Sequence, residues 1–325
     1  MGFWLDKIIS QTRIPYPIFF GLIGLFSYLL GIPFMIKTSN LQAFLFDPRW
    51  MLIAIFGAMT GISFIFVYRR FSDSLNEIKP LFESEDKFEK TKDKLMGRLT
   101  NKVYWIIVVF WIVINSLTFT ELLRNFWWWS YYQPYIISAY YLMEGLPVFL
   151  FASIFTYMIP FGLTWAYRDL CLKTSFKKDS LVSEWMEPFK GFKNLITLTM
   201  FAAAVYSLFP LGIWGLAFKE TVFNYFTYAA IAIVLIPTVL LPHYYFHKLF
   251  SNVKKSQIDV YRRELFEVSA QREKDIPRRT LLLLEVLNSE QMKTWLIDVK
   301  TLGEILLVAL MHVSFVEILA TLINH

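Results

Sequence analysis

The stretch that decides the fold is IPYPIFFGLIGLFSYLLGIPFMI, residues 14–36, which contains no charged side chain. An α-helix needs about 20 mainly apolar residues to cross the hydrocarbon core of a bilayer. Inside a membrane every backbone N–H and C=O must be paired within the protein, so only helices and closed barrels can span it. The long uninterrupted apolar run favours a helix. We therefore expect residues 14–36 to form a transmembrane helix.

Six further segments have the same apolar character, and they are residues 50–68, 103–121, 136–163, 194–218, 221–246 and 299–323. The chain is 56% hydrophobic and 18% charged, whereas soluble domains carry about 25% charged residues. These features predict an all-α fold, a polytopic transmembrane bundle of seven membrane helices. We expect one integral membrane domain over residues 1–325.

The basic residues are distributed unevenly between the connecting segments. Of the 32 Lys and Arg residues, 28 fall in alternate segments, which are residues 1–13, 69–102, 166–193 and 247–300. Lys and Arg accumulate in cytoplasmic loops, so this asymmetry predicts a cytoplasmic N-terminus and an external C-terminus in a plasma or cell inner membrane. The same positive charge favours contact with anionic lipid at the cytoplasmic face. A basic surface could instead bind nucleotides, nucleic acid or acidic proteins. Because the positive-inside bias already explains the charge, we predict that the protein binds no nucleic acid.

Helical patterns continue outside the membrane segments, in cytoplasmic regions 69–102, 166–193 and 247–298. Arg69 and Arg70 follow the second membrane helix and anchor its cytoplasmic end. Pro80 divides the first region into two helical pieces, and Glu83–Lys87 and Asp86–Lys90 are favourable i,i+4 pairs. The N-terminal residues 1–13 form a short amphipathic foot in this interpretation.

The sixth membrane helix is predicted to run on into the cytoplasm as far as Glu267, because an apolar stripe persists at helical spacing. A new helix is expected to start at Asp275 and Pro277. It contains the apolar run Leu281–Leu287 and closes at Asn288 and Ser289. The long fourth segment is predicted to kink at one of its prolines, Pro147 or Pro160.

Glycines on the first two membrane helices allow close helix packing, as small residues do in bilayers. They are Gly21, Gly24 and Gly31 on the first and Gly57 and Gly61 on the second.

The sequence contains no recognisable catalytic motif. The single cysteine, Cys171, excludes a disulfide within the chain. No Walker A motif, nucleophile elbow or HExxH sequence is present. We therefore predict neither an enzyme nor a cofactor. His243 and His247 stand four residues apart, a spacing that places two imidazoles on one helix face as in metal sites. A metal site needs a third and a fourth ligand, so this pair alone predicts no metal.

Ionisable side chains inside membrane segments are the best indicators of function. Each one costs about 2.5–3.5 kcal/mol near the bilayer centre, so such residues are rare and usually have a role. The candidates for a pore or ion path are Glu317, His312, Glu304, Glu144 and Asn115. Glu144 and Glu317 are predicted to lie at similar depths. They would line a cation-attracting vestibule in a channel, form a cation or proton site in a transporter, or bond to each other and join two helices.

An aromatic cluster between the third and fourth helices contains Trp127, Trp128 and Trp129. Aromatic rings gather at the headgroup level of membranes, which explains the cluster as an interfacial belt. The alternative is an aromatic cage for an external ligand, and a cation would suit such a cage.

The order of elements resembles that of the insect-type gustatory and odorant receptors. Residues 295–302, WLIDVKTL, are similar to the apolar–Asp–Leu entry to the last helix of that family. The family's closing aromatic–Gln-type motif is absent, because this helix ends ILATLI at residues 318–323. The resemblance implies a tetramer in which the last helix lines a cation pore and the cytoplasmic extensions hold the subunits together.

The leading functional hypothesis is thus an oligomeric cation-permeable channel that is a homo-oligomer, with gating by a ligand as one option. One alternative is a secondary transporter with a midplane site around broken helices, for which Pro147, Pro160, Pro210 and Pro237 are candidates. Another is a non-transporting scaffold or sensor that binds a cytoplasmic partner.

Overall fold

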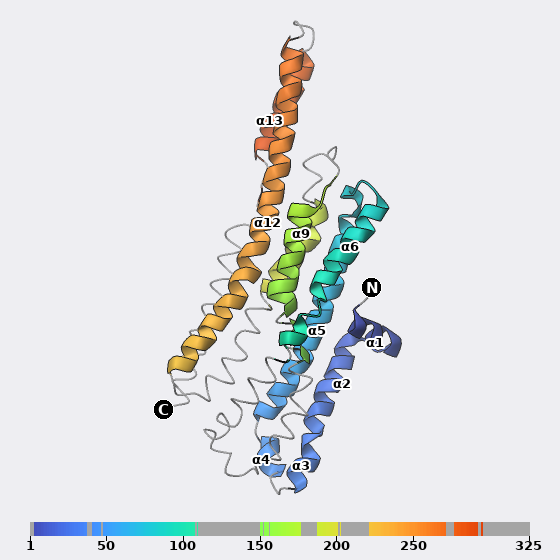
Figure 1. The fold of residues 1–325 in the computed structure, drawn as a ribbon, viewed down its shortest axis with the longest axis vertical. Coiled ribbons are helices and arrows are strands. Elements are labelled where there is room, and N and C mark those ends of the chain that lie inside the picture. Colours follow the sequence, from blue (N-terminus) through green and yellow to red (C-terminus); the bar gives the residue numbers. More distant parts are fainter. Residues whose placement is uncertain are drawn as a thin grey trace.

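The computed structural model describes a large part of the chain, namely residues 3–37, 41–46, 48–107, 109, 150–151, 153–155, 157–176, 187–200, 202, 221–270, 276–291 and 294. These residues are almost entirely helical and contain no strand. The predicted all-α class is therefore confirmed for the described part. The helices form an elongated bundle whose long axis runs nearly parallel to most of them (Figure 1).

The N-terminal half contributes six labelled helices and one short turn. They are α1 (Trp4–Thr12), α2 (Tyr16–Leu29), α3 (Gly31–Lys37), α4 (Leu41–Phe46), α5 (Pro48–Glu77), the 3₁₀ turn η1 (Lys79–Leu81) and α6 (Glu85–Leu99). The rest contributes the π-helical turn η3 (Met158–Leu163), α9 (Thr164–Lys173), the 3₁₀ turn η4 (Glu187–Phe189), α12 (Thr221–Ala270) and α13 (Ile276–Gln291). A helix over residues 190–200 follows η4 directly.

Two described segments are long and apolar enough to cross a membrane, Tyr16–Pro33 and Ala54–Glu77. They correspond to the first two predicted membrane helices. Most or all of the predicted segments 103–121, 136–163, 194–218 and 299–323 lies outside the described residues. Seven crossings therefore stay a prediction.

The helix α1 forms the expected amphipathic foot. Leu5 and Ile9, four residues apart, are buried against the bundle, while the backbone N–H of Phe3 donates to the Tyr68 hydroxyl at 3.1 Å. Arg13 ends the helix in a left-handed conformation, with φ 57°, and so redirects the chain into α2. The foot is thus held to the end of α5 by both packing and hydrogen bonding.

Two boundaries differ from the sequence-based expectation in this region. The predicted helix 14–36 is divided at Leu30 into α2 and α3, and the connection between the first two predicted membrane helices, residues 37–49, contains the short helix α4. Tyr28 of α2 stacks on Phe44 of α4, with ring centroids 5.1 Å apart. This tertiary contact, which no local pattern announces, explains the extra helix.

Close packing between α2 and α5 depends on glycine, as predicted. A Cβ at Gly24 would lie 2.9 Å from the backbone oxygen of Ala54 and 3.2 Å from the Cβ of Ala58. A Cβ at Gly61 would overlap the ring of the fully buried Phe20. Gly21 differs, since a Cβ there would meet no atom within 4 Å. Gly24 and Gly61 are therefore the contact points between the two helices.

The Gly24→Ala substitution should lower the Tm of the detergent-purified protein, because the backbone of α5 cannot yield to the added methyl group. We expect a loss of about 1–3 kcal/mol, as for other overpacked interiors. The matched control is Gly21→Ala on the same helix, which gains helix propensity worth up to about 1 kcal/mol without a clash. Equal Tm values for the two variants would contradict this account of the α2–α5 contact.

Region 69–102 follows its predicted helical pattern. The chain leaves α5 at Glu77, turns through η1 at Pro80 and enters α6 behind Ser84. The Ser84 hydroxyl accepts a hydrogen bond from the backbone N–H of Lys87 at 3.3 Å and thus caps the helix. Both predicted i,i+4 ion pairs are present, Lys87 with Glu83 and Lys90 with Asp86.

Pro160 lies at the irregularity expected in the fourth membrane segment. Residues Met158–Leu163 form a π-helical turn, which leads without a break into α9. Proline lacks the N–H that a regular helix needs, and an inserted residue is one way for a helix to absorb this loss. The other candidate, Pro147, lies outside the described residues.

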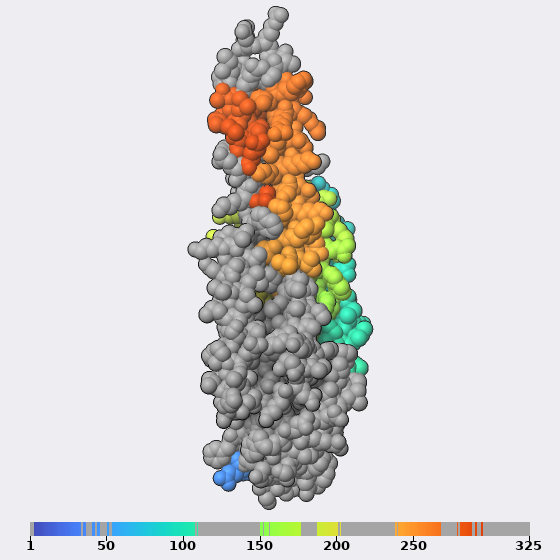
Figure 2. All heavy atoms as spheres, turned by 90° about the vertical axis from the view of Figure 1, so that its left-hand side faces the viewer, coloured from blue at the N-terminus to red at the C-terminus, as the bar shows by residue number. Residues whose placement is uncertain are grey.

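The longest helix among the described residues is α12, a single helix of 50 residues that continues through Pro237. The predicted continuation of the helix over 221–246 as far as Glu267 is therefore confirmed, while its membrane crossing and the side of the membrane on which it continues stay predictions. Its distal half extends past α6 and α9, and α13 packs along it (Figures 1 and 2). The helix α13 begins at Ile276, as expected, but the predicted end at Asn288 and Ser289 is wrong, because the helix reaches Gln291.

Aromatic rings form the core where α5, α9, α12 and the helix after η4 meet. The rings are those of Phe71, Tyr167, Phe189, Phe192, Phe246 and Phe250. All six side chains are essentially inaccessible to solvent. Most of their contacts are tilted or edge-to-face, the geometry that aromatic quadrupoles prefer. This cluster fixes the four helices relative to one another.

Candidate functional site

A buried carboxylate joins α6 to α9. The side chain of Asp169 is 5% exposed and accepts from two cations. Arg98 of α6 approaches one oxygen with its Nη2 at 3.1 Å, and Lys173, one turn along α9, approaches the other at 2.7 Å. Hydrogen bonds of this kind, between ionised groups, are stronger than those between neutral groups. Asp169 thus connects two segments that are 71 residues apart in sequence.

Burial opposes ionisation of Asp169, but the hydrogen bonds from Lys173 and Arg98 outweigh that effect and hold the pKa of its carboxyl below the usual value. A carboxyl with a lowered folded-state pKa stabilises the fold above its unfolded-state pKa. That contribution is present at neutral pH and disappears as the pH falls through the folded-state pKa. The group is therefore an ionised structural link at physiological pH.

Replacing Asp169 by Asn should lower the Tm at pH 7, because the amide loses the charge that two cations share. We expect about 2 kcal/mol of lost stability, the range for hydrogen bonds to charged groups. The control is Asp86→Asn, whose exposed i,i+4 ion pair is worth less than about 0.5 kcal/mol. A Tm for D169N within the range of this control would refute the link.

The π-helical turn rests against the end of α6, beside this link. The Tyr157 hydroxyl donates to the backbone oxygen of Arg98 at 2.9 Å. A Cβ at Gly162 would lie 3.2 Å from the Cα of Leu99, so the two backbones approach closely there. Turns of this kind are frequent at functional sites. Here the turn, Arg98 and Asp169 form one junction between η3, α6 and α9.

A groove with charged walls lies between α5 and the helix after η4. It has a volume of about 500 Å³ and is lined by Arg70, Glu77, Glu187, Pro188, Lys190, Gly191 and Asn194. The Glu77 carboxylate accepts from the backbone N–H of Gly191 at 3.1 Å and ties its two walls together. The groove can therefore offer both cations and carboxylates to a polar ligand.

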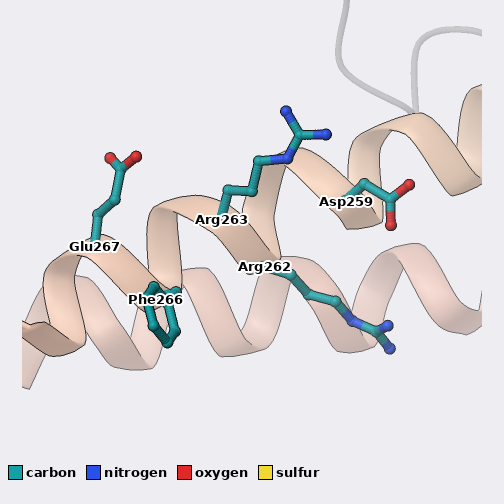
Figure 3. Close-up of a pocket in the computed structure, with 5 residues that line it drawn as sticks. All are labelled: Asp259, Arg262, Arg263, Phe266 and Glu267. Atoms are coloured by element: carbon teal, nitrogen blue, oxygen red, sulfur yellow. The ribbon is translucent and has the colours of Figure 1, made fainter.

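A second, smaller depression of about 380 Å³ lies near the C-terminal end of α12. Its lining residues are Asp259, Arg262, Arg263, Phe266 and Glu267, all from one helix (Figure 3). Arg262 extends to Glu290 of α13, with its Nη2 3.1 Å from the carboxylate. The Phe266 ring, by contrast, is 78% exposed. A depression built from a single helix holds no ligand by itself.

The histidine pair is on α12, as predicted, at the level where this helix packs on α9. His243 is buried, and its Nε2 atom has no hydrogen-bond partner in the described part of the chain. No group of three or more His, Cys, Asp or Glu side chains within the described ranges could hold a metal ion. His243 and His247 therefore belong to no such group among these residues.

Cys171 lies inside the bundle on α9. Burial raises the pKa of its thiol well above the ordinary value. A thiol without thiolate character is a poor nucleophile, so its environment gives Cys171 a packing role.

The remaining predicted site residues lie outside the described residues. They are Asn115, Trp127, Trp128, Trp129, Glu144, Glu304, His312 and Glu317. Their proposed roles stay predictions. Sequence reasoning missed the Arg98–Asp169 link and the groove. The i,i+4 spacing of Asp169 and Lys173 was the one available signal for the link, and Arg70 was recognised only as a membrane anchor.

Comparison of the chain with protein-family models, with curated proteins and with solved structures found no match.

Proposed function

We propose that this chain is a multi-pass membrane protein that assembles into a homo-oligomeric, cation-permeable channel. The observation that carries the proposal is apolar surface that is exposed at two places in the described part of the chain. One place is the outward face of α2, which suits lipid, and the other is the C-terminal part of α12 with α13, which suits a second subunit.

The outward face of α2 supports a membrane location. Ile18, Leu22, Leu25, Phe26 and Leu29 lie on this helix and are each 45–63% exposed. Burying apolar surface is worth about 25 cal/mol per Å², so a water-facing stripe of this kind is unfavourable. Contact with the hydrocarbon core of a bilayer instead of water removes that cost. Only 22% of the Tyr16–Pro33 segment is buried within the protein, unlike the core helix of a soluble fold.

The arrangement of the charged helices supports a cytoplasmic position for the basic loops. The helices α6, α9 and α13 and the distal half of α12 gather at one end of the molecule, away from α3 and α4 (Figure 1). These elements come from the predicted basic regions 69–102, 166–193 and 247–298. A single orientation thus places most of the positive charge on the cytoplasmic side, as the positive-inside rule requires.

The distal α12–α13 hairpin supports an oligomer. Four leucines of α13 are 49–63% exposed, Leu281, Leu283, Leu284 and Leu287. They lie in the cytoplasmic part in this proposal, where lipid cannot cover them. Large exposed apolar patches mark interaction sites. A second copy of the chain is the occupant we propose, in keeping with the resemblance to receptors whose cytoplasmic extensions hold the subunits together.

The ion path in this proposal is formed around the last membrane helix, with Glu304, His312 and Glu317 near the pore. Glu144 and the tryptophans Trp127–Trp129 would lie at the outer mouth. Carboxylates attract cations into a pore. The transporter alternative is less well supported, because α12 remains helical through Pro237 and the turn at Pro160 packs on cytoplasmic α6.

The oligomer is tested by native mass spectrometry of the detergent-purified protein. We expect a ring of three to five subunits. The double variant Leu284→Glu, Leu287→Glu should dissociate it, because two charges would be buried at the contact without partners. The control is Lys248→Gln, Lys255→Gln, which changes the net charge equally on an exposed part of α12. A wild-type monomer would overturn the proposal.

The ion path is tested by recording reconstituted protein under ion substitution. The Glu317→Gln variant should reduce the cation-to-anion permeability ratio by about twofold or more, because a charge that concentrates cations is lost. Glu267→Gln on the cytoplasmic part of α12 is the control and should leave the ratio unchanged. An unaltered reversal potential in E317Q would remove Glu317 from the pore.

A further inference from the structure

The groove between α5 and the helix after η4 lies at the cytoplasmic surface of the membrane, if the membrane location proposed above holds. Arg69, the neighbour of Arg70, pairs with Asp6 of the foot at 2.8 Å and lies over the ring of Tyr16, 5.3 Å from its centroid. Tyr16 is the first residue of α2. These contacts place the start of one apolar helix and the end of another at the same level, and Arg70 is at that level.

The two cations of the groove are available to a ligand. Arg69, Arg98 and Lys173 all have carboxylate partners. Arg70 and Lys190, in contrast, make no ion pair or side-chain hydrogen bond in the described part of the chain. They come from different helices and line one space. Two unpaired cations that line one space favour the binding of an anion there.

The carboxylates of the groove limit what that anion is. Glu77 is held in place by the Gly191 N–H, and Gly191 leaves no room for a Cβ between Glu77 and the buried Ser74. Glu187 lines the same wall as Lys190. With two cations and two carboxylates the lining is neutral overall, so a simple polyanion gains little. A ligand that carries both phosphate and hydroxyl donors complements every wall.

The order of these residues along the helices determines which end of the ligand faces the membrane. Arg70 and Asn194 are next to the apolar segments that end at Tyr68 and start at Leu195. Glu77 is seven residues beyond Arg70, which is about 10 Å farther from the membrane at the rise of an α-helix. A ligand that fills the groove therefore has a phosphate near the membrane and a bulky polyol outside it.

We propose that this groove binds the headgroup of an inositol phospholipid of the cytoplasmic leaflet. The phosphodiester contacts Arg70 and the Asn194 amide, a ring phosphate contacts Lys190, and ring hydroxyls donate to Glu77 and Glu187. Basic pockets at the cytoplasmic ends of membrane helices bind such headgroups in other proteins. Serine and ethanolamine headgroups are too short to reach the outer carboxylates while their phosphate stays at Arg70.

The test is lipid binding to the full-length protein in mixed micelles, measured by native mass spectrometry. The probes are phosphatidylinositol 4-phosphate, phosphatidylserine, phosphatidylcholine and soluble inositol 1,4-bisphosphate. We expect phosphatidylinositol 4-phosphate to bind at least about fivefold more tightly than phosphatidylserine. Arg70→Gln and Lys190→Gln should each remove about that preference, as for the loss of a charge-assisted contact. Lys193→Gln is the matched control, because Lys193 is on the same helix, between the lining residues Gly191 and Asn194, but does not line the groove itself.

A further variant tests the role of the carboxylate wall. Gly191→Ala displaces Glu77, so it should weaken binding of the inositol lipid more than binding of phosphatidylserine. Lys190 is exposed, so K190Q should melt as the wild type does. An unchanged melting profile would exclude unfolding as the cause of lost binding.

Equal binding of phosphatidylserine and the inositol lipid, or no effect of R70Q and K190Q, would overturn the proposal. Equal affinity for the soluble bisphosphate would overturn the assignment to a lipid. The membrane location is checked separately, by fractionation of the expressed protein with membranes. A protein that fractionates with membranes but lacks lipid selectivity disproves the headgroup site alone.

Discussion

The packing of aromatic rings between α5, α9, α12 and the helix after η4 is the contact on which the other features depend. Phe71, Tyr167, Phe192 and Phe246 come from these four different helices and touch one another without any polar partner. Aromatic side chains bury large areas and prefer defined ring geometries. They therefore fix the helices in angle as well as in distance.

Two polar features are built around this apolar centre. The Arg98–Asp169 link brings α6 against α9 on one side, and the Glu77–Gly191 hydrogen bond closes the groove on another. A buried ion pair is weak evidence for stability, since burial of its charges is costly. Its value here is positional, because Arg98 of α6 reaches Asp169 of α9 only when the two helices are in the right register. The apolar centre supplies most of the stability, and the polar links select one arrangement.

Local signals predicted much of this fold, because they depend on neighbours in the chain. The turn at Pro80, the pairs Glu83–Lys87 and Asp86–Lys90, and the start of α13 near Pro277 all follow from spacing or from the chemistry of proline. The extent of α12 followed from an apolar stripe that continued beyond the membrane segment. Features that depend on distant segments were missed or misplaced. The helix α4 depends on a ring contact with α2, and α13 passes Asn288 because its packing on α12 outweighs a local stop signal.

The candidate site divides in the same way. The positions of His243 and His247 on one helix were predictable from their spacing. The pairing of Arg98 with Asp169 and the convergence of Arg70 with Lys190 were not, since each joins segments that are remote in sequence. A single sequence gives no information on which remote segments meet.

The unbroken course of α12 has a mechanical consequence. Fifty residues at the rise of an α-helix make a rod about 75 Å long. The aromatic cluster packs against α12 near the middle of the helix, at Phe246 and Phe250, so the helix can pivot at this point. A tilt of about 5° at the Thr221 end would swing the Ala270 end by about 3 Å in the opposite direction. A small motion at one end of α12 would thus shift the exposed apolar surface that α13 carries at the other end.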